Sequence, residues 1–443
     1  MGTDERPNVL FLFTDDQRFD TIRALGNAQI QTPNMDALVE AGTAFTHAAI
    51  MGGTSGAVCM PSRAMMLTGR TLFHLQECGA TIPPDHVMFP EALREVGYTT
   101  FGTGKWHNGR AAHQRCFTQG GRIFFGGMSP HFEVPVYDYD PEGAYPEGGH
   151  HVESGRHSSD LFSEAAVRFL ESYDGPAPFF AYVSYTAPHD PRDTHPRYHE
   201  MYDPDEIPLP ENFLPEHPFD NGEMTIRDEQ LAPWPRTPEI IRRHIADYYA
   251  MITHADATIG RILAALQESG RAENTILVFA GDNGLAVGRH GLMGKQNLYE
   301  HSIRVPLVMA GPGIPSGERR ENPCYLLDIY PTLFELLGLN VPESVEGLSL
   351  LPALQEERQK VRNSQFYAYR HFQRALRRGR HKLIEYSVNG HRTTQLFDLK
   401  NDPCETENLC DGTENAETMR ELRAELHRWQ QRTEDPNPDA FKG

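Results

Sequence analysis

The chain has 443 residues, enough for one large domain and a smaller one, because a single hydrophobic core stops growing at about 250–300 residues. Acidic residues outnumber basic ones by 61 to 41, and the formal net charge of −20 argues against nucleic acid or an anionic membrane as the main partner. The six cysteines show no C-x-x-C spacing, so neither a disulfide framework nor a zinc module is predicted.

The N-terminal region and the hydropathy pattern bear on where the protein resides. No apolar run approaches the roughly 20 residues of a membrane span. The first predicted strand begins so close to Met1 that a signal peptide does not fit before it. We therefore expect a soluble protein, cytoplasmic for the sequence as given and periplasmic or secreted if a signal has been removed. The oligomeric state is not predicted.

Apolar runs alternate with helical segments over the first 350 residues. Strands are predicted within 8–13, 98–107, 178–190, 275–284 and 305–313, and helices at 32–42, 158–173 and 237–270. Nearly continuous apolar runs are typical of strands buried on both faces, as in a parallel sheet. The sequence therefore predicts an α/β fold with a large, mostly parallel sheet sandwiched by helices.

Each apolar run breaks into Gly, His, Asp or Lys at its carboxyl end. Ligands of parallel sheets collect outside the carboxyl ends of the strands, so we expect these polar groups to converge there. Two long segments, 116–156 and 190–238, interrupt the alternation. Loops of this length are uncommon in compact domains unless they line a site, and we interpret both as walls of a substrate cleft.

The character of the chain changes after about residue 350. Short strand-like runs at 365–370, 382–386 and 395–399 precede a helical segment at 414–432, which predicts a smaller antiparallel sheet with one terminal helix. We therefore expect a catalytic domain over 1–350 and a small C-terminal α+β subdomain over 351–443 that completes the substrate cleft.

Oxygen-bearing side chains follow two of the buried strands. Asp15 and Asp16 come after the first, and Asp282 and Asn283 come after the run at 275–281. Asp at a strand end is often a cap or turn residue, and Asp-Asn-Gly is also a turn signal. A turn could nevertheless aim both members of the first pair at one ion, and carboxylate and amide oxygens suit calcium or magnesium. Together the four residues predict an oxygen-lined metal site.

Lysines and histidines occupy the same predicted rim. Lys105 and His107 follow the second strand, His189 follows the third, and His290 and Lys295 follow the Asp282 segment. Each of them alone is more often an ordinary surface or structural residue. Their shared position at strand ends predicts a cluster that binds an anion or transfers protons.

Cys59 begins the segment CMPSRAMMLTGR, whose proline is well placed to start a helix. A thiol near a helix N-terminus is favoured as an anion and can be a reactive nucleophile. Thiolate, however, prefers softer metals than the oxygen-lined site predicted here. This mismatch disappears if the sulfur is absent from the working enzyme.

The segment from Cys59 to Arg70 resembles the C-x-P-S-R…T-G-R signature of the type I sulfatases of the alkaline-phosphatase-like superfamily, whose cysteine is oxidised after translation to Cα-formylglycine. Further similar segments occur in the expected order: NVLFLFTDDQ, TPNMDAL, GKWH, APHDP, GDNG, GRHGLMGKQNLYEHSIRVPL and LFDLKNDPCETENL. The resemblance implies an alkaline-phosphatase-like fold, hydrolysis of sulfuric esters, and a formylglycine-generating enzyme or maturase as partner.

The resemblance also implies roles for individual residues. Asp15, Asp16, Asp282, Asn283 and the formylglycine at position 59 would hold Ca²⁺, with Mg²⁺ as an alternative. Arg63 would brace the aldehyde hydrate, and the sulfate would be surrounded by Lys105, His107, His189 and Lys295, with His290 facing the substrate. Many relatives carry Asp-His where this chain has Asp282-Asn283, but the amide still supplies an oxygen ligand.

The basic segment 367–386 resembles the closing segment of carbohydrate sulfatases, which makes Arg370, His371 and Arg374 expected substrate-binding residues. A solvated basic strand pair is the alternative. The expected substrate is a sulfated small molecule or saccharide. Two other functions stay open: a phosphonate monoester or phosphodiester hydrolase of the same superfamily, and a non-catalytic relative that binds sulfated glycans.

Overall fold

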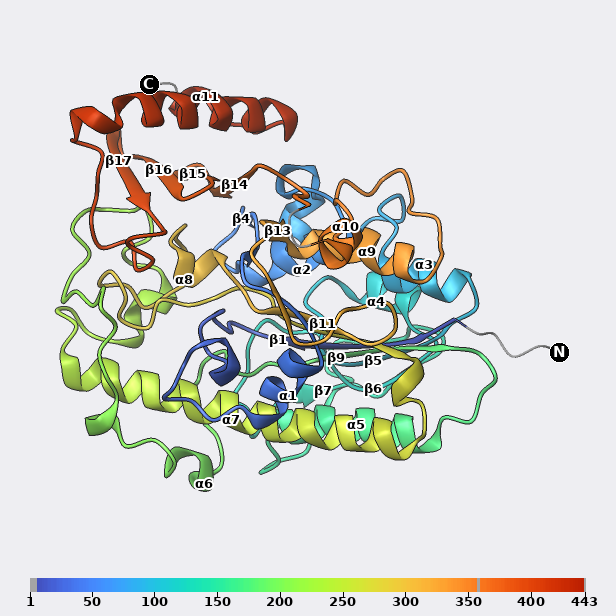
Figure 1. Ribbon diagram of the computed structural model, residues 1–443. Helices are drawn as coiled ribbons and strands as arrows, with labels where there is room; N and C mark the ends of the chain where they lie inside the picture. The colour runs from blue at the N-terminus through green and yellow to red at the C-terminus, as the bar shows by residue number, and fades with distance from the viewer. Residues whose placement is uncertain (1–5, 357–358, 442–443) are drawn as a thin grey trace.

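The structure, a computed structural model, describes residues 6–356 and 359–441. Three stretches lie outside this description: residues 1–5, 357–358 and 442–443. The first and last are the outer ends of the two predicted domain ranges. A large sheet lies between two layers of helices, and a smaller sheet with the terminal helix α11 (Ala416–Arg432) lies beside it (Figure 1). The predicted α/β fold with a smaller C-terminal sheet and helix is confirmed.

The large sheet has eight strands, all parallel to their neighbours except β11, which is antiparallel to both of its neighbours. In spatial order they are β12 (Glu318–Arg320), β2 (Gly42–Phe45), β11 (Leu307–Ala310), β10 (Thr275–Gly281), β1 (Asn8–Thr14), β9 (Phe179–Ser184), β5 (Thr99–Lys105) and β6 (Gln119–Phe124). The mostly parallel sheet predicted from continuous apolar runs is therefore present, with β1 near its centre.

The direction of β11 corrects one expectation. The run at 305–313 forms a strand, but Leu277 of β10 pairs with Ala310 in antiparallel register. The connection between these strands stays beside the carboxyl end of β10, since Pro306 accepts a hydrogen bond from the backbone of Gly281 at 3.3 Å. β11 therefore starts at this end of the sheet, and the Gly-Pro-Gly segment 311–313 that follows it lies at the opposite end.

Alternate residues of β1 pack on opposite faces of the sheet. Val9, Phe11 and Phe13 join one buried cluster, whereas Leu10 and Leu12 join the other. One face is covered by α1 (Pro33–Ala41), α5 (Ser158–Ser172) and α7 (Pro238–Glu268), and the other by α2 (Cys59–Thr68), α3 (Phe89–Glu95), α4 (Arg110–Cys116), α9 (Ile329–Leu336) and α10 (Leu351–Gln355) (Figure 1). The three predicted helices are confirmed as α1, α5 and α7.

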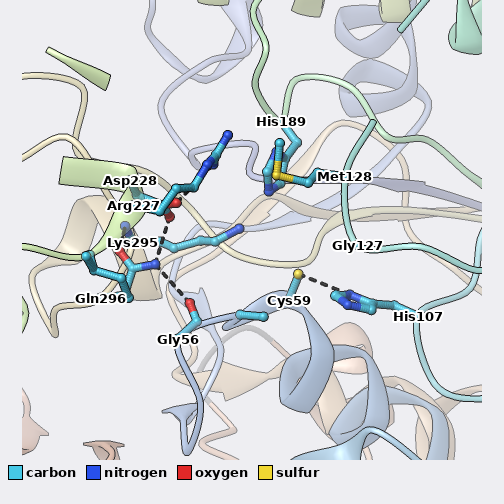
Figure 2. Close-up of a pocket in the computed structure, with 12 residues that line it drawn as sticks. Gly56, Cys59, His107, Gly127, Met128, His189, Arg227, Asp228, Lys295 and Gln296 are labelled. Carbon is cyan, nitrogen blue, oxygen red and sulfur yellow. Dashed lines mark hydrogen bonds and ion pairs between the residues drawn. The ribbon is translucent and has the colours of Figure 1, made fainter. Parts of the chain in front are cut away.

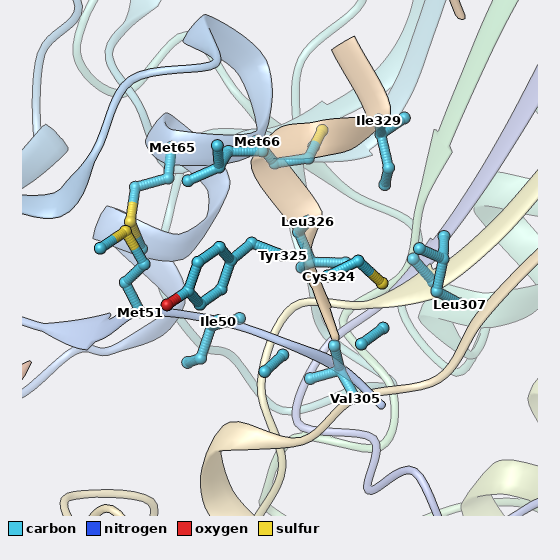
Figure 3. Packing of buried hydrophobic residues seen from close by; sticks show 14 of the residues in the cluster. Ile50, Met51, Met65, Met66, Val305, Leu307, Cys324, Tyr325, Leu326 and Ile329 are labelled. Carbon is cyan, nitrogen blue, oxygen red and sulfur yellow. The ribbon is translucent and has the colours of Figure 1, made fainter. Parts of the chain in front are cut away.

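Helix α2 is anchored by sulfur and aromatic side chains. Met65 and Met66 of α2 pack in the same buried cluster as Tyr325 and Ile329 (Figure 3). The Tyr325 hydroxyl donates a hydrogen bond to the carbonyl of Phe366 at 2.9 Å and accepts one from its N–H at 2.6 Å. This packing fixes the start of α2, where Cys59 lies, relative to both sheets.

The smaller sheet joins both parts of the chain. Its order is β17 (His391–Asp398), β16 (His381–Val388), β15 (Gln373–Arg378), β14 (Ser364–Tyr369) and β4 (Gly52–Gly53). β14 to β17 are antiparallel, whereas β4 pairs with β14 in parallel, with Gly52 opposite Ala368. A Cβ on Gly52 would lie 2.1 Å from the Ala368 carbonyl oxygen, so only glycine permits this pairing. The division of the chain into a catalytic domain over 1–350 and a C-terminal subdomain over 351–443 stays a prediction.

The remaining strands and α-helices are short. They are the strand pairs β3 (Ala48–Ala49) with β13 (Cys324–Tyr325) and β7 (Pro135–Val136) with β8 (His151–Val152), and the helices α6 (Pro196–His199) and α8 (Glu300–Ile303). Within the described ranges, none of the helices combines the length and apolarity needed to cross a bilayer.

A buried lysine at the junction between the large and small sheets yields a prediction about pH. Lys382 Nζ lies 3.0 Å from Glu300 Oε1 and 2.8 Å from Glu405 Oε1. Burial raises the pKa of Glu405 from its ordinary 4.5 to about 7, with Lys382 opposing the rise and the charge of Glu300 adding to it. A carboxyl whose pKa is raised in the folded state stabilises the fold below its ordinary pKa and loses that contribution as pH rises through about 7.

We therefore expect the Glu405→Gln variant to lose less of its free energy of unfolding than the unmodified protein between pH 5 and pH 8, as measured by urea titration at several pH values. Glu417→Gln, on the exposed surface of α11, is the control and should leave the pH dependence unchanged. An identical pH dependence in Glu405→Gln would contradict the raised pKa.

Candidate active site

Strand register brings distant polar residues together. Thr14 at the end of β1 pairs with Gly281 at the end of β10, and Ser184 at the end of β9 pairs with both Phe13 and Gly104. The residues that follow β1, β5, β9 and β10 therefore leave the sheet at one edge. The predicted convergence holds for these four strands.

Three carboxylates and an amide form the floor of the site. All four are buried: Asp15, Asp16, Asp282 and Asn283. The backbone turns at Asp16, which has a φ of 65°, so the side chains of Asp15 and Asp16 do not simply alternate as they would along a strand. The Asp16 backbone N–H donates to Asp282 Oδ1 at 2.9 Å, and Asn283 Nδ2 donates to Asp16 Oδ1 at 2.7 Å. These contacts hold Asp16, Asp282 and Asn283 in one cluster.

Three oxygens of this cluster have no hydrogen-bond partner although they are buried: Asp15 Oδ1, Asp16 Oδ2 and Asn283 Oδ1. One ligand atom from each of Asp15, Cys59 and Asp282 also lies within 4.8 Å of the others. Leaving a buried acceptor unpaired is costly unless something else satisfies it. The donor set fits a hard divalent cation such as Ca²⁺ or Mg²⁺.

Each carboxylate also has a cationic partner. Asp15 Oδ2 lies 2.5 Å from Lys105 Nζ, Asp16 Oδ1 lies 2.6 Å from Lys295 Nζ, and Asp282 Oδ2 lies 2.8 Å from Arg63 Nε. Burial raises the pKa values of Asp15 and Asp282 to about 6, although Lys105 and Arg63 oppose the rise. Burial acts in the same direction on Asp16, but Lys295 and His189 outweigh it and lower the pKa of that carboxyl.

Cys59 is the first residue of α2, as the sequence predicted, and its side chain is buried. Its Sγ lies 3.3 Å from His107 Nδ1 and 3.5 Å from Lys105 Nζ (Figure 2). Burial, together with the neighbouring Lys105, lowers the pKa of His107 to about 2, so this imidazole is neutral. Cys59 thus stands between a cation and a base.

A cavity of about 240 Å³ opens above Cys59. It is lined by Gly56, Ala57, Cys59, His107, Gly127, Met128, His189, Ile226, Arg227, Asp228, Lys295 and Gln296. In Figure 2, Lys295 extends toward Cys59 from the side opposite His107, and His189 lies above them. Both long segments, 116–156 and 190–238, contribute to the lining, as predicted.

Some residues of the site were missed by sequence reasoning. Ser184 Oγ accepts a hydrogen bond from Arg63 Nη1 at 2.6 Å, and Gln296 Nε2 donates to the Gly56 carbonyl at 2.9 Å and to Asp228 Oδ2 at 2.7 Å. Ser184 carried a usable signal, since it is a polar residue at the end of a buried strand. Asp228 carried none, because it lies in a short 3-10 helix, Arg227–Leu231, within the long segment 190–238 and follows no predicted strand.

His290 lies apart from the cavity at Cys59. Its ring stacks on Tyr299 with centroids 3.8 Å apart, and its Nε2 lies 2.9 Å from the Glu405 carbonyl oxygen. His290 has a φ of 52°, in the left-handed region of backbone conformation. It lines a second cavity of about 400 Å³. His290 does not line the cavity at Cys59, and its contact with substrate stays a prediction.

The three basic residues expected to bind substrate lie in different surroundings. Arg370 is partly exposed, pairs with Glu223 at 2.7 Å, and has its Nη2 3.3 Å from where a Cβ on Gly56 would be. His371 is exposed and contacts the ring of Phe372. Arg374 is fully buried and holds Asp435 through two hydrogen bonds of 2.6 and 2.7 Å. Arg374 does not line the cavity at Cys59, and its role in substrate binding stays a prediction.

The chain matches two known protein families. Residues 7–339 match the sulfatase family, and residues 288–432 match the family described as N-sulphoglucosamine sulphohydrolase, C-terminal. The chain belongs to the sulfatase family. The predicted recognition and the predicted sulfuric ester hydrolase are thereby confirmed.

Several relatives resemble the sulfatase over most of its length. An N-acetylglucosamine-6-O-sulfatase of Bacteroides thetaiotaomicron is 28% identical, with 99% of this chain and 90% of that protein covered. A multifunctional alkaline phosphatase superfamily protein of Trinickia caryophylli is 30% identical, with 79% and 77% covered.

Solved structures agree with this assignment. A protein in complex with its substrate D-glucosamine-2-N,6-O-disulfate has a TM-score of 0.82 at 26% identity, with 98% of this chain and 99% of that chain covered. The phosphonate monoester hydrolase of Agrobacterium radiobacter has a TM-score of 0.74 at 25% identity, with 95% and 96% covered. The predicted alkaline-phosphatase-like fold is therefore confirmed.

Proposed function

We propose that this sulfatase hydrolyses a sulfate monoester on a carbohydrate, with Cys59 converted to Cα-formylglycine and a Ca²⁺ ion bound beside it. The observation that supports this most is a cavity lined by Cys59, His107, His189 and Lys295. Lys105 Nζ lies 3.5 Å from Cys59 Sγ, and buried oxygens of Asp15, Asp16 and Asn283 have no hydrogen-bond partner. Conversion of Cys59 requires a formylglycine-generating enzyme or maturase as a partner.

The metal would be held by Asp15, Asp16, Asp282 and Asn283 together with residue 59. This is supported by the unpartnered buried oxygens of Asp15, Asp16 and Asn283, and by ligand atoms of Asp15, Asp282 and Cys59 that lie within 4.8 Å of one another. When bound, the ion neutralises these carboxylates and polarises oxygens bonded to carbon or sulfur. Mg²⁺ has the same preference for oxygen and is the alternative.

Residue 59 supplies the nucleophile, and Cys59 Sγ marks where its oxygens would lie. A hydrated formylglycine carries two hydroxyls on one carbon, so that one oxygen can attack sulfur and the other can lose its proton to expel sulfate. Serine or cysteine has no second hydroxyl, which explains why this position must be modified. Arg63, fixed by Asp282 and Ser184, brings positive charge toward residue 59.

The remaining residues bind the anion and move protons. Lys105 and Lys295 bring ammonium groups to the sulfuryl oxygens, where fixed positive charge stabilises the transition state. His189 or Lys295 donates a proton to the departing alcohol oxygen, since both line the cavity. His107 accepts the proton that residue 59 releases, since its Nδ1 lies 3.3 Å from Cys59 Sγ.

A carbohydrate substrate is supported by the relatives. The Bacteroides protein is named for an amino-sugar sulfate, and the solved neighbour holds a sulfated glucosamine. A second candidate, hydrolysis of phosphonate monoesters or phosphodiesters, is supported by the Agrobacterium neighbour, since sulfur and phosphorus esters share a geometry. Parallel kinetics on an aryl sulfate, a 6-O-sulfated glucosamine and an aryl phosphonate test this. A higher kcat/KM on the phosphonate would overturn the proposal.

Arg370 allows a test of saccharide binding. Its guanidinium lies beside Gly56 at the edge of the cavity and is partly exposed. We expect Arg370→Ala to raise KM for a sulfated disaccharide about tenfold with little change in kcat, because the lost contact is made equally in the ground state and the transition state. KM for a small aryl sulfate should not change.

Arg378→Ala is the matched control for this test. Arg378 lies on the same small sheet, at the end of β15, and pairs with Glu421 at 3.4 Å on the exposed surface. Its replacement should leave both KM values unchanged. An equal rise in KM for both Arg370→Ala and Arg378→Ala would count against a specific contact at Arg370.

A further inference from the structure

The cavity at Cys59 has room for about one ring of the substrate beside the sulfate group. Its volume of about 240 Å³ is smaller than the roughly 300–1,000 Å³ of sites that hold drug-sized ligands. Substituents on the ring carbons next to the sulfate ester must therefore lie against the side chains that line the cavity. One of these side chains, Asp228, has no part in the chemistry proposed above.

We propose that the Asp228 carboxylate selects the alcohol part of the substrate. It accepts a hydrogen bond from a free hydroxyl or N–H group next to the sulfate ester, and it excludes a second anionic group at that position. This role rests on the proposed function, because it concerns the alcohol that the reaction releases. It narrows the substrate class to sulfate esters that carry an unsulfated hydrogen-bond donor beside the reacting group.

Asp228 is held in a fixed orientation. Arg227 Nη1 donates to its Oδ1 at 3.0 Å, and Gln296 Nε2 donates to its Oδ2 at 2.7 Å. Each carboxylate oxygen can accept two hydrogen bonds, so both oxygens keep an acceptor position. The side chain is 10% exposed, which leaves it within reach of a molecule in the cavity. An acceptor that is already ordered loses little entropy when a ligand binds.

Gln296 fixes the position of this acceptor relative to the reacting groups. Its Nε2 also donates to the Gly56 carbonyl at 2.9 Å, and its Oε1 accepts a hydrogen bond from the Lys295 backbone N–H at 3.0 Å. Gly56 lies shortly before Cys59 in the chain, and the Lys295 side chain extends toward Cys59 (Figure 2). Asp228 is thus tied both to the segment that leads into residue 59 and to the lysine that faces the sulfate.

Arg227 also lines the cavity, but its charge is already engaged. Its two terminal nitrogens donate to the two oxygens of Asp190, and Nη1 donates to Asp228 as well. A second sulfate or a carboxylate on the substrate would have to displace one of these partners. It would also lie beside Asp228, and neither of the two anions has a proton to donate to the other. Both effects act against an anionic substituent.

The other side of the cavity suits the apolar face of a ring. Met128 lies on the side away from Asp228 in Figure 2, and Ile226 lines the cavity as well. A sugar ring presents C–H groups on its faces and hydroxyls along its edge. Met128 and Ile226 can cover a face while Asp228 receives a hydroxyl at the edge, so that a few polar groups among apolar ones set the orientation.

The experiment uses three matched substrates and protein that carries formylglycine at residue 59, with Ca²⁺ in excess. The substrates are cyclohexyl sulfates with a trans hydroxyl, methoxy or carboxylate group on the neighbouring ring carbon. The methoxy group keeps the oxygen but cannot donate a hydrogen bond. We expect kcat/KM to be about 10–100-fold higher for the hydroxyl ester than for the methoxy ester, and lowest for the carboxylate ester.

Asp228→Asn keeps the size of the side chain and removes its charge. The ratio of kcat/KM between the hydroxyl and methoxy esters should fall at least about fivefold, and the carboxylate ester should gain relative to both. Glu229→Gln is the matched control. Glu229 accepts hydrogen bonds from the N–H groups of Met293 and Gly294 at 2.9 and 2.8 Å, and it is not among the described residues that line the cavity. A disturbance of the wall alone changes all three rates together, so this variant should keep the ratio.

Three results would overturn the role of Asp228: equal kcat/KM for the hydroxyl and methoxy esters, the highest kcat/KM for the carboxylate ester, or an unchanged preference in Asp228→Asn. Each of them would leave the proposed function standing, because sulfate is still released from an ester. If none of the three esters released sulfate while an aryl phosphonate was cleaved, the proposed function would be overturned together with the role of Asp228.

Discussion

Replacing Cys59 with alanine is expected to lower kcat/KM for a sulfate ester by at least about 10⁴-fold and to leave the fold intact. The substitution removes one atom, Sγ, whose polar contacts are those with His107 and Lys105. The variant therefore lacks the side-chain group from which attack on sulfur is proposed. The packing of Met65 and Met66 in α2 is unchanged, so the fold should stay intact. Kinetics and thermal unfolding of the same preparation measure both outcomes.

Cys324→Ala is the matched control, since Cys324 is a fully buried cysteine in β13, far along the chain from the active-site segments. It should lose some stability, because a cavity forms in the core, and keep its activity. Peptide mass spectrometry on residue 59 adds a second measurement: activity should rise in proportion to the fraction converted to formylglycine. Activity retained by Cys59→Ala would refute the assigned nucleophile.

Much of the fold could be predicted because the central strands are buried on both faces. The segments that form β1, β9 and β10 are nearly continuous apolar runs, and the long amphipathic pattern of α7 is unmistakable. The direction of β11 could not be predicted, because an apolar run of four residues carries no information on whether the strand pairs in parallel or antiparallel. The short helix α3 was missed because seven residues are too few to establish a helical period.

The floor of the site could be predicted for a related reason. Parallel strands must end at one edge, so Asp15 and Asp282 come together although 267 positions separate them in the chain. What the sequence could not supply is the partner of each charge. Arg374 belongs to a basic run that suggested an exposed strand, but its side chain points inward to Asp435. Neither residue alone signals this ion pair.

The charges at the site bear on how metal and substrate depend on each other. Lys105, Lys295 and Arg63 are each paired with a carboxylate that also belongs to the predicted metal site. Without a cation, the lysines are held by Asp15 and Asp16 and are less available to an incoming sulfate. A bound Ca²⁺ would neutralise the carboxylates and leave the ammonium groups to the substrate. Metal binding and sulfate binding should therefore strengthen each other.

Substitution of Asp282 tests this coupling. We expect Asp282→Asn to weaken Ca²⁺ binding at least about tenfold and to lower kcat/KM at least about 10³-fold, because the metal loses a charged ligand and Arg63 loses its 2.8 Å partner. Calorimetric titration with Ca²⁺ and steady-state kinetics at saturating Ca²⁺ measure the two losses separately. Excess Ca²⁺ should restore only the part of the activity that depends on metal occupancy.

Asp435→Asn provides the comparison, since Asp435 is likewise a buried carboxylate that holds an arginine, Arg374, at 2.6 Å. That variant should lose thermal stability and bind Ca²⁺ normally. If the two variants lost Ca²⁺ affinity equally, the loss would reflect general destabilisation of the fold. If Asp282→Asn bound Ca²⁺ as the unmodified protein does, the ion would have to lie elsewhere, and the unpartnered oxygens of Asp15, Asp16 and Asn283 would need another explanation.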